Sequence, residues 1–124
     1  MNLLAGWIGL LVGVLSGSVI GLFFHDDHWL GGYASFSRRM LRLGHISFFG
    51  LGFVNMAFAL TVERIGLTAP YAEIASMAFV AGAIAMPVCC LLAAWRKPLR
   101  RLFPVPVLAV AVGILSVLAG WPEP

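Results

Sequence analysis

The sequence predicts an all-α integral membrane protein whose helices form an up-down four-helix bundle. Hydrophobic residues make up 61% of the 124 residues, charged residues only 10%, and the mean hydropathy is +0.99. A soluble domain is usually about half apolar and about a quarter charged. The apolar runs are continuous rather than alternating, which favours helices over the strands of a membrane barrel. Four spans of roughly 20 residues each use most of the chain and leave no room for a soluble domain.

The predicted spans are separated by short polar segments that contain helix-breaking residues. The breaks fall at Gly31 and Gly32, between Gly66 and Pro70, and at Pro98. The spans then cover residues 3–24, 43–62, 71–95 and 102–121 of a single transmembrane domain, 1–124. We expect the helix of the second span to begin before residue 43, with Ser37 as its N-cap. The first run lacks a basic start and is too long for a signal peptide, so we expect it to be retained as a span.

Basic residues are distributed unevenly between the two sides of the predicted bundle. Seven of the eight Lys and Arg residues lie in segments 25–42 and 96–101, and only Arg64 lies in the connection between the second and third spans. The positive-inside rule therefore predicts that these two segments face the cytoplasm, with the N-terminus and the C-terminus outside. The expected location is a bacterial inner membrane.

Composition and motifs exclude several classes of function. The net charge of +3 does not indicate a nucleic-acid partner, because the basic residues gather at helix ends, as membrane topology requires. Cys89 and Cys90 are adjacent and are the only cysteines, so we predict no disulfide. The sequence has no phosphate-binding loop and no HExxH or CxxC motif. We therefore expect no enzymatic activity.

Glycine recurs every fourth residue in the first span. The repeat consists of Gly9, Gly13, Gly17 and Gly21. Residues four apart lie on nearly the same side of a helix, so these glycines form a smooth groove that lets another backbone approach closely in lipid. Two interpretations follow. The groove packs against small residues of the third span, or it serves self-association and the binding of other membrane subunits. The small residues of the third span are Ala75, Ala78, Gly82 and Ala85.

Asn55 lies near the middle of the second span and is a further helix-packing candidate. A buried amide must find hydrogen-bond partners in lipid. We expect it to bond to Ser76, to a backbone carbonyl freed by Pro87, or to another subunit.

His45 is the only histidine within a predicted span and lies about one turn from the predicted cytoplasmic end. Ionisable groups in a span are costly and often functional. A neutral imidazole here suits a haem iron, and the helical stripe through His45 contains Gly52, which would leave space for a macrocycle. Proton relay is a second interpretation. The third is an interfacial histidine bonded to a carbonyl or a lipid headgroup.

His25 and His28 flank two aspartates at the inner end of the first span. Imidazole and carboxylate groups suit Zn²⁺ or Fe²⁺, so the two histidines are candidate metal ligands, although a metal site needs three or four ligands. The alternative is a solvated loop in which Asp26 and Asp27 pair with the arginines of the second span.

The function that these features favour is that of a small accessory or structural subunit of a larger membrane complex, for example a respiratory one. The glycine groove and the lack of catalytic groups support this hypothesis. One alternative is a haem-binding or redox-linked membrane protein that uses His45. Another is a small transporter or channel, although no span carries a charged residue near its centre.

Overall fold

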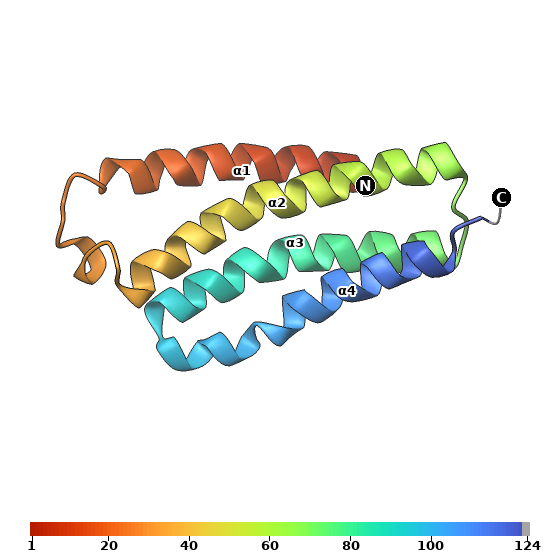
Figure 1. The fold of residues 1–124 in the computed structure, drawn as a ribbon. Helices are drawn as coiled ribbons and strands as arrows, with labels where there is room; N and C mark the ends of the chain where they lie inside the picture. The colour runs from red at the N-terminus through yellow and green to blue at the C-terminus, as the bar shows by residue number, and fades with distance from the viewer. Residues whose placement is uncertain (123–124) are drawn as a thin grey trace.

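The computed structural model describes residues 1–122 and is helical throughout its regular structure (Figure 1). The long helices are α1 (Asn2–Leu22), α2 (Phe36–Ile65), α3 (Tyr71–Trp95) and α4 (Pro104–Ala119). Two short 3-10 helices, η1 (Trp29–Gly31) and η2 (Lys97–Leu102), lie in the connections at one end. Four helical segments are long and apolar enough to cross a membrane when η2 is counted with α4. The predicted all-α fold with four up-down membrane helices is confirmed.

The helix boundaries differ from the prediction mainly at the start of α2. This helix begins at Phe36, and its N-cap is Ser35, whose side chain accepts a hydrogen bond of 3.2 Å from the Arg38 N–H. The prediction of Ser37 as N-cap is therefore wrong. Ser37 lies in the first turn, and its Oγ donates to the Ala94 carbonyl of α3 at 2.9 Å. Either serine could cap by sequence, and the extended backbone at Ser35 decides the choice.

The helices pack as a row in chain order, so the bundle is open. Helix α2 packs against α1 and α3, and α3 packs against α2 and α4. Helix α1 touches α3 only slightly, and α1 and α4 lie on opposite sides of the row (Figure 1). The central position of α3 matches its burial. In its apolar 18-residue stretch 33% of the residues are buried, against 11% in the corresponding stretches of α1 and of the segment that contains α4.

The apolar core lies between α2 and α3 near the end where these two helices are joined. Phe58 and Phe79 are its largest members, and their ring centroids are 5.1 Å apart. Leu67 and Ala75 complete the buried cluster, and Val110 and Val117 of α4 pack against it. The outward faces of α1 and α4 carry large aliphatic side chains that suit contact with lipid.

Gly9, Gly13 and Gly17 of α1 pack against α2 and not against the small residues of α3 as expected, and a methyl group added at Gly21 would meet nothing within 4 Å. A methyl group added at Gly9 would lie 3.1 Å from the Phe48 carbonyl oxygen, and one at Gly13 would lie 2.7 Å from the Phe49 ring. Among the small residues of α3, Gly82 receives Val110 of α4 and Ala75 lies in the buried core cluster. The close contacts at these glycines therefore join helices that are consecutive in sequence, α1 with α2 and α3 with α4.

Candidate functional site

His45 is seated in the interface between α1 and α2, directly over Gly17. A methyl group on Gly17 would lie 2.5 Å from the His45 Cε1, so only a glycine leaves room for the ring. The His45 Nδ1 lies 3.0 Å from the Ser16 Oγ. On its own helix the ring meets the edge of Phe49, at 5.3 Å and 85°. The position of the His45 ring therefore requires a residue without a side chain at position 17.

The hydrogen bonds around Ser16 determine which imidazole nitrogen is available. The Ser16 Oγ donates its single proton to the Gly13 carbonyl at 3.0 Å. With the proton so placed, the Ser16 Oγ accepts from Nδ1–H of His45 and Nε2 keeps the free lone pair; in the other tautomer the hydroxyl donates to Nδ1 instead. Such a bond fixes the tautomer and the ring orientation, as partners of metal-binding histidines do. The arrangement can present a lone pair to a ligand or accept a proton.

The packing of the ring limits what can approach it. The ring edge rests on α1, and the space that Gly17 provides is filled by the imidazole itself. A macrocycle does not fit between His45 and α1 in this arrangement. His45 is recognisable from the sequence, whereas Ser16 is not, because small polar residues are common in membrane helices.

A second polar cluster joins α1, α2 and α3 through Asn2, Asn55 and Ser76. The Asn2 Nδ2 donates to the Asn55 Oδ1 at 2.8 Å and to the Ser76 carbonyl at 3.2 Å. The Ser76 Oγ donates to the Asn2 Oδ1 at 2.5 Å. The Asn55 Nδ2 donates to the Leu51 and Phe79 carbonyls. Both amide groups thus have partners for every N–H, although Asn2 is only 5% and Asn55 0% exposed.

The hydrogen-bond partners of Asn55 differ from those expected. Ser76 belongs to the network, but it reaches Asn55 only through Asn2. The carbonyl that Asn55 bonds on α3 belongs to Phe79 and is not one freed by Pro87. Asn2 was not among the predicted residues, because it stands at the first position of α1 and resembles an ordinary interfacial residue.

His25 and His28 lie exposed in the connection between α1 and α2. The backbone N–H of His28 donates to the Asp26 Oδ1 at 2.8 Å. This bond engages the carboxylate in a local turn. Within residues 1–122 no group of three or more His, Cys, Asp or Glu side chains is placed to hold a metal ion. The two histidines therefore lack a third ligand in the described part of the chain.

Arg38 anchors the same connection to α2. Its side chain is 3% exposed, and the guanidinium lies 4.9 Å from the Phe24 ring centroid and 5.5 Å from that of Trp29. It donates at 3.4–3.5 Å to the Phe24 and Asp26 carbonyls. The expected ion pair with Asp26 is replaced by these backbone bonds and cation–π contacts. Arg38 thus holds the loop in place from its interior.

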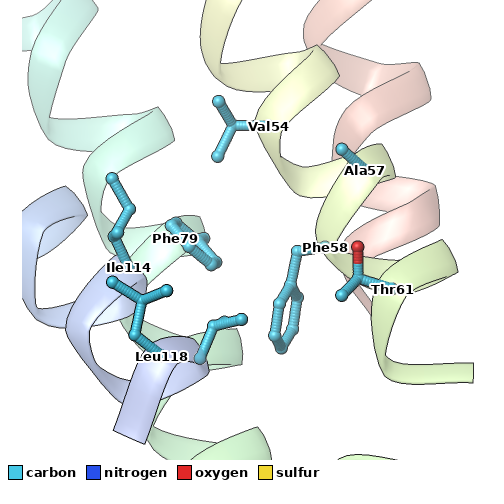
Figure 2. A pocket seen from close by; sticks show the side chains of 8 residues that line it. Val54, Ala57, Phe58, Thr61, Phe79, Ile114 and Leu118 are labelled. Atoms are coloured by element: carbon cyan, nitrogen blue, oxygen red, sulfur yellow. The ribbon is translucent and has the colours of Figure 1, made fainter. Parts of the chain in front are cut away.

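Two apolar grooves run along the open faces of the row. One, of ≈ 220 Å³, lies between α2 and α4, with Phe58 and Phe79 at its floor (Figure 2). Ile114 and Leu118 of α4 form its other wall in the same view (Figure 2). The second groove, of ≈ 330 Å³, lies between α1 and α3 on the other face. Its walls include Ala5, Gly9 and Ala83. His45 lines neither groove.

Comparison of the sequence with models of protein families, with curated proteins and with solved structures found no match.

Proposed function

We propose that this membrane protein is a non-enzymatic accessory subunit that receives a transmembrane helix of another subunit in the α1–α3 groove. The observation that carries the proposal is the open row of helices, which leaves α1 with one full neighbour and exposes a ≈ 330 Å³ apolar groove beside it. Helices associate in lipid by close packing of small residues. Ala5, Gly9 and Ala83 line this groove and suit such an approach.

The polar groups inside the spans support a structural role. Asn2, Asn55 and Ser76 bond to one another and to backbone carbonyls. Such a network holds three helices in register and leaves the amide donors without free capacity for a substrate. His45 and Ser16 are likewise bonded across the α1–α2 interface.

Photo-crosslinking in the native membrane tests the proposal. A photoreactive residue at Ala83 points into the groove, and one at Leu11, which is 59% exposed on α1 but outside the groove, is the matched control. We expect one defined protein adduct from Ala83 and none from Leu11. Lipid adducts alone at Ala83 would show that acyl chains fill the groove and would refute the proposal.

Haem ligation by His45 is the second candidate. The Ser16 contact orients the ring, and a haem would reach Nε2 only after α1 moved away, because Nε2 lies against Gly17. Purified protein made with ample haem supply should then show a Soret band that His45→Ala removes while the helical circular dichroism spectrum stays unchanged. A colourless wild-type preparation would rule out this function. The transporter alternative has no comparable support from the arrangement of polar groups.

The proposed orientation places both termini outside and the segments 25–42 and 96–101 in the cytoplasm of a bacterial inner membrane. It rests on the seven-to-one division of basic residues. A reporter that is active only outside the membrane, fused after Pro124, should be active. The same reporter inserted in segment 96–101 should be inactive, and the reverse pattern would contradict the orientation.

A further inference from the structure

A groove at the basic end of the row combines two arginines with an apolar wall. This end is where α1 finishes, α2 begins and the α3–α4 connection lies. The groove has a volume of ≈ 620 Å³. Arg100 and Arg101 of η2 line it, and no acidic residue does. The other lining residues are Phe36, Met40, Phe103 and Pro104.

The residues beside the groove are typical of the depth at which a bilayer changes from acyl chain to headgroup. Trp95, at the end of α3, is 73% exposed, and Arg96 stacks on it with the guanidinium 4.8 Å from the ring. Exposed tryptophan next to arginine is typical of the membrane interface. Met40 is one turn further along α2 than Phe36 and therefore deeper in the span. The arginines and the apolar wall thus match the headgroup and the upper acyl chain of one lipid.

The basic side chains at this end differ in the contacts that they make with the rest of the protein. Arg38 is enclosed by aromatic rings and backbone carbonyls, and Arg42 lies 4.1 Å from the Tyr33 ring centroid and donates to the Tyr33 carbonyl. Arg100 and Arg101 are instead exposed on η2. Lys97 joins them in an adjoining hollow, so the positive charge is concentrated on one side of the groove.

We propose that this groove binds the headgroup of an anionic phospholipid. The guanidinium groups of Arg100 and Arg101 donate to the phosphodiester oxygens, an acceptor that the planar arginine fork fits well. Phe36, Met40 and Phe103 contact the glycerol and the first methylene groups of one chain. The site is independent of the α1–α3 groove, which lies on other helix faces and has no charged lining residue.

Native mass spectrometry of the whole protein in mild detergent, titrated with phosphatidylglycerol, tests the site. We expect one retained lipid per chain. Arg101→Gln should weaken binding about fivefold, and the Arg100→Gln/Arg101→Gln double variant about thirtyfold, since each basic residue near an anionic surface contributes about that factor. Arg39→Gln is the matched control, because Arg39 is exposed at the same end on α2 and does not line the groove.

Three outcomes would overturn the proposal. An equal loss in Arg39→Gln and Arg101→Gln would mean diffuse attraction of charge instead of a site. Inorganic phosphate that binds as tightly as phosphatidylglycerol would identify a general anion site. Met40→Ala tests the apolar wall: weaker lipid binding with unchanged helical content supports the proposal, and unchanged lipid affinity contradicts it.

Discussion

Replacing Gly6 with alanine adds one methyl group where α1 crosses α2. The new Cβ would lie 2.8 Å from the Gly52 carbonyl oxygen, a backbone atom that can move only with its helix. Helix α1 must therefore shift outward, and overpacking of this kind costs about 1–3 kcal/mol. The shift also strains the hydrogen bond between Asn2 and Asn55, which lies one turn away at 2.8 Å. We expect the free energy of unfolding to fall by about 2 kcal/mol.

Gly21 supplies the matched control on the same helix. A methyl group there meets nothing within 4 Å. Because alanine is the better helix former by about 0.5–1 kcal/mol, Gly21→Ala should be neutral or stabilising. Unfolding by sodium dodecyl sulfate, followed by tryptophan fluorescence in mild detergent, measures both variants. Equal effects of Gly6→Ala and Gly21→Ala would refute the placement of the glycine face against α2.

Three further variants test the polar contacts. Asn55→Leu should lower the free energy of unfolding by about 1–3 kcal/mol in the same assay, because it leaves one N–H of the buried Asn2 amide without an acceptor; an unchanged midpoint would contradict this. Arg38→Lys should speed limited proteolysis within residues 23–35, since an ammonium cannot make the same carbonyl contacts; the exposed Arg39→Lys should not. Ser16→Ala should change the ¹⁵N NMR pattern of the His45 imidazole by removing the bond that selects its tautomer, and an identical pattern would exclude that bond.

Hydropathy was sufficient to predict the number of spans and their approximate positions. Hydropathy locates the apolar segment that prefers lipid, and the helix that contains this segment can be longer. Helix α2 runs from Phe36 to Ile65 and so extends beyond the predicted span 43–62, as was expected at its start, because its basic first turns are helical but polar. Local chemistry decides such an end. Here the extended backbone at Ser35 allows capping of the Arg38 N–H, and no sequence pattern distinguishes Ser35 from Ser37.

The candidate sites were only partly predictable. Periodicity identified a glycine face on α1 and a stripe through His45 on α2, because residues that share a face follow from helix geometry. It could not say that these two faces meet, since the neighbour of a face depends on tertiary packing. The role of Asn2 was hidden for the same reason. Only the antiparallel register of α1 and α2 brings its amide beside Asn55.

The distribution of small residues explains why the row stays open. Gly9 and Gly52 allow α1 and α2 to approach, and Gly82 with Gly113 does the same for α3 and α4. The remaining faces of α1 and α4 carry large side chains, such as Leu11 and Leu115, which are 59% and 63% exposed. In lipid no hydrophobic drive pulls such faces together, because acyl chains solvate them equally well. A closed ring would need a third set of small residues between α1 and α4. Without that set, the row does not close and the α1–α3 groove stays open along its face.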